Sequence, residues 1–311
     1  MEIIRGQHNI RPAHRGCVAT IGNFDGVHHG HQLLLAHLNA KRNELGAPSV
    51  LITFEPLPRE YFAGGSRPPG RLTRFREKIT LLARAGIDRV ICLPFNEQVS
   101  QITATSVIED FLVGQLGVRY VVVGDDFRFG RGREGDYTML KHGGDRLGFE
   151  VSHIGTLTFD HERVSSSRIR EALAGGDIRL AEKLLGHPFF VMGHVIYGRQ
   201  LGRQLGVPTA NIPLHRYRAP LEGVFAVTVT GLERAYDGIA NVGIRPTIGG
   251  KEPLLEVHLF DFAGNVYGKC LTVTFRHKLR DERQFASLDA LKQQIAHDIT
   301  QARAWLGAAD G

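Results

Sequence analysis

The first half of the chain alternates short apolar runs with longer stretches of helical periodicity. The apolar runs are rich in Val and Ile and lack strict alternation, which is typical of strands buried on both faces. Such strands are expected at residues 17–22, 49–54, 89–93 and 119–124. Helices are expected between them at 29–45, 73–85 and 103–116. Strands that alternate with helices predict βαβ units and a parallel, Rossmann-like sheet.

The second half follows a different pattern, in which short strand-like runs are separated by turns rich in Gly, Pro and Thr. Two short helices come first, at 166–174 and 178–185, with Asp177 as the expected N-cap of the second. Strands are then expected at 190–197, 223–230, 238–242, 254–260 and 271–275. This spacing predicts a small antiparallel barrel or sandwich, and an amphipathic helix is expected at 288–306. We place the boundary near Gly186, which gives domains of residues 1–186 and 187–311.

Composition agrees with two soluble globular domains. The chain has 311 residues, 42% of them hydrophobic and 23% charged, which argues against disorder. The 38 Lys and Arg exceed the 32 Asp and Glu, for a net charge of +6, without any run of like charges. The excess indicates either a solvated surface or a positive cleft that attracts anionic phosphate ligands, and it excludes a nucleic-acid-binding tail.

The cysteines and the N-terminus predict a cytoplasmic protein without a membrane partner. Cys17, Cys92 and Cys270 are widely spaced and form no C-x-x-C pair, so they read as buried small hydrophobes in a reducing compartment. No signal peptide is visible, and no apolar run approaches the ~20 residues that span a bilayer. The sequence carries no prediction of an oligomeric state.

The segment GNFDGVHHGH, residues 22–31, joins the first predicted strand to the first predicted helix. Ligands of an open parallel sheet bind beyond the carboxyl ends of its strands, where helix N-termini offer free N–H groups to phosphate. His28 and His31 are three apart and share one face if a helix begins here. Imidazoles at that position can donate hydrogen bonds to phosphate oxygens and stabilise charge that develops on an attacked α-phosphate.

Two other interpretations of this loop stay open. His28 and His31 could bind zinc, although no third ligand has a recognisable spacing. The glycines could also serve turns alone, which is the usual role of an isolated glycine-rich loop. A second segment, VSSSRIR at 164–170, favours the phosphate interpretation. Its serines can cap a helix, and together with the arginines they also suit the β- and γ-phosphates of a nucleotide.

These two segments resemble the signature pair of the nucleotidylyltransferase superfamily. With VGDDFRFG at 123–130, the first half is similar to the FMN adenylyltransferase domain of bacterial bifunctional riboflavin kinase/FAD synthetases. The resemblance implies that His28 and His31 bind the ATP phosphates and the transition state. The remaining nucleotide contacts that it implies are Asn23, Asp126, Ser166, Ser167 and Arg170. The family motif usually reads Ser-Ser-Thr, and Ser167 keeps the hydroxyl of the threonine that it replaces.

Aromatic residues of the same half are candidates to stack on a flavin. Phe62 and Phe129 are the flavin-binding residues that we predict, whereas Phe54 lies in a predicted strand and is expected in the core. The segment Glu55-Pro56-Leu57-Pro58 departs from the family's Pro-His-Pro ending, so Leu57 cannot supply the contact of that histidine.

The second half carries its own candidate nucleotide site. GHVIYG at 193–198 leads into GRQLGVPTAN at 202–211, which is not a Walker A loop. Its glycines could be barrel turns, yet Thr209 and Asn211 lie two apart on one side of an extended chain. A hydroxyl and an amide carbonyl are hard oxygen ligands that suit Mg²⁺ bridging nucleotide phosphates.

Glu256 is the candidate general base of this half. Strand alternation places Glu256 and His258 on one face and Leu255 on the other. Such a face could simply be solvated. A riboflavin 5′-hydroxyl, however, must lose a proton as it attacks a γ-phosphate, and a carboxylate can accept it.

The strings of this half resemble the riboflavin kinase domain, together with NVGIRPT at 241–247 and EVHL at 256–259. The resemblance implies that Thr209 and Asn211 hold Mg²⁺ and ATP, that Gly193 and Gly198 approach ATP, and that Glu256 is the base. Arg280, in LRDE at 279–282, matches a stretch near the isoalloxazine ring, although an exposed salt-bridging arginine is an equal alternative.

The resemblance therefore implies an α/β nucleotidylyltransferase domain followed by a riboflavin kinase-like all-β barrel with a terminal helix. The kinase converts riboflavin and ATP to FMN, the adenylyltransferase converts FMN and ATP to FAD and pyrophosphate, and Mg²⁺ serves both steps. One alternative is an adenylyltransferase for another acceptor, such as nicotinate mononucleotide or phosphopantetheine. Another is a flavin-sensing or RNA-binding protein with inactive sites. Thr209, Asn211 and Glu256 argue against the first alternative, and together with His28 and His31 they argue against the second.

Overall fold

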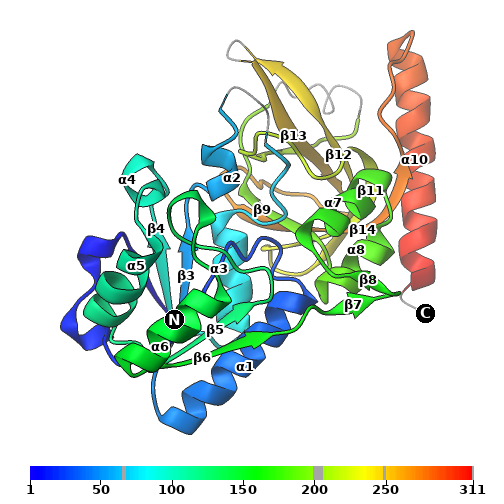
Figure 1. Ribbon diagram of the computed structural model, residues 1–311. Helices are drawn as coiled ribbons and strands as arrows, with labels where there is room; N and C mark the ends of the chain where they lie inside the picture. The colour runs from blue at the N-terminus through cyan, green and yellow to red at the C-terminus, as the bar shows by residue number, and fades with distance from the viewer. Residues whose placement is uncertain (65–67, 199–205, 248–249, 310–311) are drawn as a thin grey trace. The chain divides into compact units, whose positions relative to one another are not determined.

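The computed structural model describes residues 1–64, 68–198, 206–247 and 250–309. The chain divides into two compact units. The first consists of Met1–Ser66 and Lys78–Val164, and the second consists of Arg67–Glu77 and Ser165–Gly311. Each unit has its own sheet, and we describe each by itself (Figure 1).

The first unit is built on a six-stranded parallel sheet in the order β1-β4-β3-β2-β5-β6. The strands are β1 (Glu2–Arg5), β2 (Val18–Ile21), β3 (Ser49–Phe54), β4 (Arg89–Leu93), β5 (Tyr120–Gly124) and β6 (Glu150–Ile154). From β2 the chain runs to β3 and β4 on one side and returns to β5 and β6 on the other. The strand order therefore reverses at β2, and the loop after β2 lies where open parallel sheets bind ligands.

Helices cover both faces of this sheet. They are α1 (His29–Leu45), α2 (Pro58–Tyr61), α3 (Phe75–Arg84), α4 (Glu97–Ser100), α5 (Ala104–Ser106) and α6 (Tyr137–Leu147), with short 3₁₀ turns η1 (Gln7–Asn9), η2 (Pro12–His14) and η4 (Arg131–Arg133). α1 contacts β2, β3 and β5. It ends at Gly46, whose φ of 58° places it in the left-handed region that favours glycine.

The helix expected at 103–116 differs from an ordinary α-helix. After the short α5, it continues as a π-helix, η3 (Val107–Gln115). Its residues Ile108, Phe111 and Leu112 pack with alternate residues of the strands in the core of the unit. The guanidinium of Arg15 donates hydrogen bonds to the carbonyls of Val113 and Gly114 near the end of this helix.

The second unit is a barrel-like antiparallel sheet in the order β10-β13-β12-β11-β14-β9. The strands are β9 (Phe190–His194), β10 (Ala210–Pro213), β11 (Gly223–Thr230), β12 (Tyr236–Thr247), β13 (Gly250–Leu259) and β14 (Cys270–Arg280), and a separate hairpin, β7 (Thr158–Phe159) with β8 (Glu162–Arg163), belongs to the first unit. A bridge between Ile196 and Asn211 joins the chain after β9 to β10, so the two ends of the sheet meet.

Among its described residues, the second unit also has the helices α7 (Ser166–Gly175), α8 (Ile178–Leu185) and α10 (Leu288–Ala309). Asp177 caps α8 as predicted, because its carboxylate accepts a hydrogen bond from the amide of Leu180 at 2.9 Å. Ala302 and Leu306 of α10 pack with Val224 and Ala226 of β11 in a core cluster. The C-terminal half of α10 thus packs against the barrel (Figure 1).

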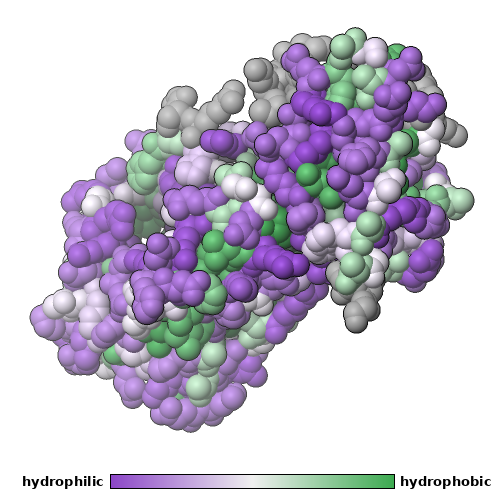
Figure 2. Space-filling view, turned by 90° about the vertical axis from the view of Figure 1, so that its right-hand side faces the viewer, coloured by the Kyte–Doolittle hydropathy of each residue, from purple (hydrophilic) through white to green (hydrophobic). Residues whose placement is uncertain are grey.

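The surface and the cysteines have ordinary features. The face drawn in Figure 2 is mostly hydrophilic, with smaller hydrophobic areas between polar and charged residues. Across the described ranges, no helix has the length and apolar character that a bilayer crossing requires. Cys17 and Cys92 are buried as expected, whereas Cys270, at the first position of β14, is only half-buried. Burial raises the pKa of the Cys17 thiol to about 12, so this thiol is not a nucleophile.

Candidate active sites

The loop between β2 and α1 is held in an unusual backbone conformation. Phe24 and Val27 have φ angles of 47° and 43°, in the left-handed region that a β-branched residue such as Val rarely adopts. The Asn23 side chain is exposed, but its carbonyl accepts hydrogen bonds from Lys78 Nζ at 2.6 Å and from Thr53 Oγ1 at 3.4 Å. Such strain persists where the surroundings over-determine it, and it clusters at ligand sites.

His28 and His31 come together at the start of α1, as their spacing predicts. Their rings stack with centroids 3.7 Å apart and an interplanar angle of 18°. His28 is the N-cap, and its Nδ1 accepts a hydrogen bond from the backbone amide of His31 at 3.4 Å. Because Nδ1 accepts, the proton of neutral His28 resides on Nε2, where it can be donated to a ligand.

Both imidazoles are neutral at neutral pH. Burial lowers the pKa of His28 to about 4, although the nearby carboxylate of Asp25 opposes the shift. Burial, followed by the charges of His28 and Lys78, holds the pKa of His31 well below its usual value. His31 Nδ1 is buried without a hydrogen-bond partner among the described atoms. Among all the residues that the structure describes, no group of three His, Cys, Asp or Glu side chains has the arrangement of a metal site.

The other predicted residues of the first unit lie in three different environments. The exposed carboxylate of Asp126 accepts a hydrogen bond from Arg163 at 2.6 Å. Phe129 is 8% exposed, belongs to the core and stacks on Phe127 at 5.3 Å. Phe62 is 67% exposed and meets Phe95 edge-on at 5.6 Å. Of the two predicted flavin contacts, Phe62 thus presents an accessible ring and Phe129 does not.

Phe54 and Leu57 are placed as their sequence contexts indicated. Phe54 is half-buried and packs edge-on against Phe95 at 5.5 Å. Leu57, which stands where the family has histidine, is fully buried. Its side chain therefore has a packing role.

The second phosphate segment opens α7. Ser165 is the N-cap, and its hydroxyl accepts a hydrogen bond from the amide of Arg168 at 3.3 Å. Ser166 is half-buried and Ser167 is exposed in the first turn. Arg170 Nε donates a hydrogen bond to the carbonyl of Gly70 at 2.6 Å, within the same unit. One serine therefore caps the helix, and the next two remain at its positive end.

The barrel has a pocket of about 530 Å³ on the face that carries Glu256. In the strand register Glu256 is paired with Asn211 of β10 on one side and with Asn241 of β12 on the other. Paired residues of antiparallel strands share a face with Cβ atoms roughly 5 Å apart. Leu255 and Val257 are buried on the opposite face, as alternation predicts. The carboxylate thus lies in a row of polar side chains at a pocket rather than on a plain solvated face.

The Thr209–Asn211 segment lies at the seam of the barrel. Thr209 lines the pocket, whereas Asn211 is 4% exposed and its backbone carbonyl accepts from the amide of Ile196 at 2.8 Å. Gly198 packs so closely on Asn211 that a Cβ there would lie 2.5 Å from the amide nitrogen. A Cβ on Gly193 would lie 2.4 Å from Ile212. Both predicted glycines are therefore sites of close backbone approach. Gly202 to Leu205 lie outside the described residues.

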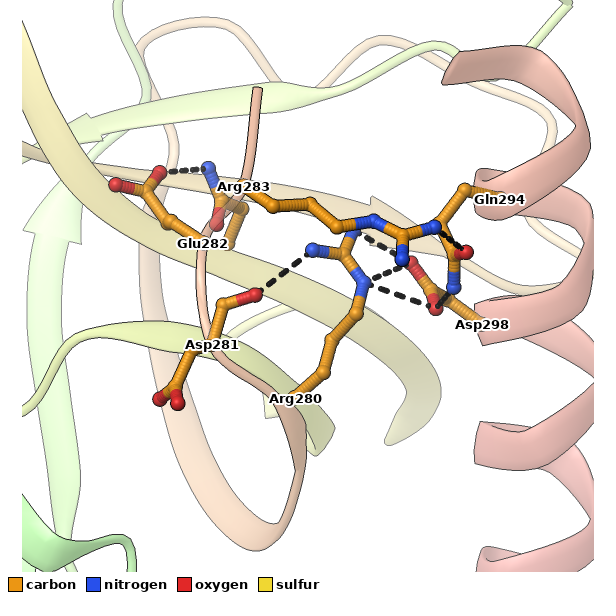
Figure 3. Close-up of polar contacts among 7 residues, drawn as sticks. Arg280, Asp281, Glu282, Arg283, Gln294 and Asp298 are labelled. Carbon is orange, nitrogen blue, oxygen red and sulfur yellow. Dashed lines mark hydrogen bonds and ion pairs between the residues drawn. The ribbon is translucent and has the colours of Figure 1, made fainter. Parts of the chain in front are cut away.

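Arg280, which also lines the pocket, forms a salt bridge (Figure 3). Its Nε and Nη2 donate to the carboxylate of Asp298 at 2.8–3.1 Å, and Asp298, on α10, is 1% exposed. Gln294 also donates to Asp298, at 2.6 Å, and accepts from Arg283. The Arg280 guanidinium lies 5.7 Å from the ring of Phe285, another residue of the pocket. The salt bridge of the alternative interpretation is therefore present, but the pair is largely buried rather than exposed.

The chain matches two family models in succession. Residues 10–168 match the model described as FAD synthetase, and residues 185–306 match the model described as riboflavin kinase. A bifunctional riboflavin kinase/FMN adenylyltransferase from Pseudomonas fluorescens is 50% identical over 98% of this chain and 97% of its own length. The protein of the same description from Escherichia coli K12 is 48% identical over 99% of this chain and 98% of its own.

The chain belongs to the bifunctional riboflavin kinase/FMN adenylyltransferase family. Membership confirms the predicted family, the predicted fold class and the predicted pair of activities, riboflavin kinase and FAD synthetase, which produce FMN and FAD. A crystal structure described as a macrolide-efflux protein from Streptococcus pneumoniae also shares the fold. It is 31% identical, with a TM-score of 0.82 over 98% of this chain and 100% of its own.

Three polar residues at or near these sites were not predicted as site residues from the sequence. Asn241 lines the pocket and donates to Glu282 at 2.9 Å, and its Oδ1 has no hydrogen-bond partner among the described atoms. Asp298 could have been noticed, because it is an acid between Ile295 and Ile299 on the apolar stripe of the terminal helix. Lys78, 55 residues from the loop that it contacts, carries no comparable local signal.

Proposed function

We propose that the barrel pocket is the riboflavin kinase site. The observation that carries this assignment is the row of Asn211, Glu256 and Asn241 across three strands beside a pocket of about 530 Å³. A volume of that order suits a flavin-sized ligand. Glu256 accepts the proton of the riboflavin 5′-hydroxyl as its oxygen attacks the γ-phosphorus of ATP, and ADP leaves as the bond to the bridging oxygen breaks. Arg280, which lines the same pocket, is the flavin contact.

Thr209 and Asn211 are the residues that would hold Mg²⁺ with the ATP phosphates. The donor set fits, because a hydroxyl and an amide carbonyl are hard oxygen ligands and Asn211 is nearly buried. When bound, Mg²⁺ would neutralise charge on the phosphates. Two neutral protein ligands also leave room for phosphate oxygens and water, which Mg²⁺ usually retains. Gly193 and Gly198 let the backbone approach ATP closely.

The adenylyl transfer would use the groups of the first motif pair. His28, which donates from Nε2, and His31, stacked on it, bind the ATP phosphates and the transition state, and Asn23 and Asp126 contact the nucleotide. Ser166, Ser167 and Arg170 bind the β- and γ-phosphates. An FMN phosphate oxygen attacks the α-phosphorus and pyrophosphate leaves. No general base is needed, since a phosphate monoester with a second pKa of about 6 is largely dianionic at neutral pH.

The domain boundary, the flavin contacts and the location of the protein also belong to the proposed function. The boundary between the functional halves falls near residue 186, so FMN is made by residues 187–311 and consumed by residues 1–186. Phe62 contacts the flavin of the second reaction, whereas the ring of Phe129 is buried in the core and is no longer proposed as a contact. The protein acts in the cytoplasm on small molecules, without nucleic acid or membrane.

A time course with riboflavin, ATP and Mg²⁺, followed by chromatography for FMN and FAD, tests the division of labour. We expect Glu256→Gln to block FMN formation while added FMN is still converted to FAD. His28→Ala should do the reverse. Nucleotide titration should give two ATP per chain in the presence of flavin. Loss of both reactions from either change in a folded protein, or a single ATP site, would contradict the proposal.

A further inference from the structure

A buried lysine lies beneath the loop that carries the two histidines. Lys78, at the fourth position of α3, is 0% exposed. Its Nζ donates to the carbonyl of Asn23 at 2.6 Å and to Thr53 Oγ1 at 3.3 Å. Thr53, itself fully buried, donates to the same carbonyl at 3.4 Å. Lysine is almost never fully buried without polar partners, so the ammonium has a specific reason to be here.

The carbonyl that Lys78 binds belongs to the strained part of the loop. Asn23 immediately precedes Phe24, whose φ is 47° and whose ring lies 4.9 Å from that of His31. Val27, with a φ of 43°, immediately precedes His28. A strained loop keeps its shape only while its anchors hold, and two donors converge on the Asn23 carbonyl. Release of that carbonyl would let Phe24 relax and would shift the stacked imidazoles.

Position matters strongly at such a site. Displacement of a reacting or stabilising group by about 1 Å can lower a rate by about 10²-fold. The charge of Lys78 acts in the same direction, because it favours the neutral form of His31 beside it. The cation is also shielded from solvent, so its field at the loop is weakly screened.

We infer that Lys78 is a positioning residue for adenylyl transfer, which acts by fixing the Asn23 carbonyl and through it the loop that presents His28. The inference rests on the proposed function of the two histidines. Lys78 touches neither ATP nor flavin in this account. Its contribution is to the geometry of groups that do.

Two substitutions separate the hydrogen bond from the charge. Lys78→Met keeps the length of the apolar stem and removes both, whereas Lys78→Gln removes the charge but keeps an N–H donor for the Asn23 carbonyl on a side chain one atom shorter. We expect kcat for conversion of FMN to FAD to fall about 30-fold or more in Lys78→Met, with the KM for FMN unchanged. Lys78→Gln should remain within about fivefold of the wild type, because the anchor survives.

The kinase reaction of the same full-length chain reports on folding. Conversion of riboflavin to FMN should be unchanged in both variants, and Lys141→Met, which alters a partly exposed lysine paired with Asp145, should leave both reactions unchanged. An Lys78→Met enzyme with an intact kinase and FAD synthesis within twofold of the wild type would overturn the inference. An equal loss in Lys78→Met and Lys78→Gln would also overturn it, because a neutral N–H donor would then fail to restore the anchor.

Two further variants cover the remaining outcomes. If Lys78→Met does not fold, the isosteric Thr53→Val removes the second donor to the same carbonyl and should lower kcat for FAD synthesis several-fold. An unchanged rate in Thr53→Val would reject the anchor.

His28→Ala, assayed in parallel, separates the inference about Lys78 from the proposed function of the histidines. If it leaves FAD synthesis intact, the assignment of the histidines fails, whereas a loss in His28→Ala without a loss in Lys78→Met rejects the role of Lys78 alone.

Discussion

Glu256 and Asn211 lie directly opposite each other in the register of β13 and β10. The pairing places the proposed base beside a buried amide at the seam where Ile196 bridges to β10. A strand pair fixes both side chains on one face, so displacement of one reaches the other. The seam is therefore a part of the barrel where a single added methyl group should affect phosphoryl transfer.

Gly198→Ala tests this relationship. A Cβ on Gly198 would lie 2.5 Å from the amide nitrogen of Asn211, so Asn211 must move. We expect kcat/KM of the kinase for ATP to fall about 10- to 100-fold, because a ligand of the phosphates is misplaced. Conversion of FMN to FAD should be unchanged.

Gly307→Ala is the matched control, because an added Cβ at Gly307 on α10 meets nothing within 4 Å. Steady-state kinetics of both reactions in the two variants provides the measurement. Equal kinase activity in Gly198→Ala and Gly307→Ala would reject a role for the seam.

The pair of Arg280 and Asp298 should stabilise the barrel and shape its pocket. Asp298→Asn leaves the Arg280 guanidinium without a carboxylate in a largely buried setting. We expect a loss of about 3 kcal/mol in the free energy of unfolding, toward the lower end for a broken buried pair because Arg280 is partly exposed. The KM for riboflavin should rise as well. Urea unfolding followed by fluorescence of Trp305, the only tryptophan, reports on α10.

Asp261→Asn is the control for this change. The Asp261 carboxylate pairs with Arg303, which lies on α10 like Asp298, through two hydrogen bonds of 2.8 Å. This pair is exposed to solvent. Exposed pairs contribute little, so stability should hardly change. Similar losses in the free energy of unfolding for Asp298→Asn and Asp261→Asn would mean that burial does not set the strength of the pair of Arg280 and Asp298.

The sequence predicted the elements whose pattern is local and strong. Strands buried on both faces, such as β3 and β4, match their predicted bounds, because a run of Val, Ile and Leu leaves few alternatives. Helix α1 matches as well, with its start at the histidines and its end at Gly46. The edge strands β1 and β6 were missed, because their exposed polar residues weaken the apolar signal.

The same distinction between local and non-local patterns applies to the candidate sites. His28 and His31, or Thr209 and Asn211, are close in sequence and could be found as motifs. The contacts that hold them are not local. Lys78 reaches Asn23 across 55 positions, and Arg280 reaches Asp298 across 18. Packing of separate elements decides such pairs, and a single sequence carries no periodicity that reports it.

Acid should destabilise the first unit through His28. Burial depresses its pKa in the folded state to about 4, from 6.5 in the unfolded chain. The unfolded chain therefore takes up the proton first, and stability present above pH 6.5 is lost as the pH falls toward 4. The full effect is about 3 kcal/mol. His31 shifts in the same direction and should add to it.

Urea unfolding at several pH values between 7.5 and 4.5, followed by circular dichroism, measures this loss. Any transition without a change in Trp305 fluorescence belongs to the first unit, because that tryptophan lies in the second. His28→Gln should flatten the pH dependence, whereas His142→Gln, at an exposed position of α6, should not. An unchanged slope in His28→Gln would contradict the assignment.

Phe62 and Phe129 should respond differently to truncation. Phe62 is exposed, so Phe62→Ala should leave stability and the kinase unchanged and raise the KM for FMN in FAD synthesis about tenfold, the value of one lost aromatic stack. Phe129 is buried against Phe127 and the core, so Phe129→Ala should cost about 3–5 kcal/mol of stability. Tyr217→Ala, an exposed aromatic of the second unit, is the control for Phe62. If the KM for FMN is the same in Phe62→Ala as in Tyr217→Ala, Phe62 is not a flavin contact.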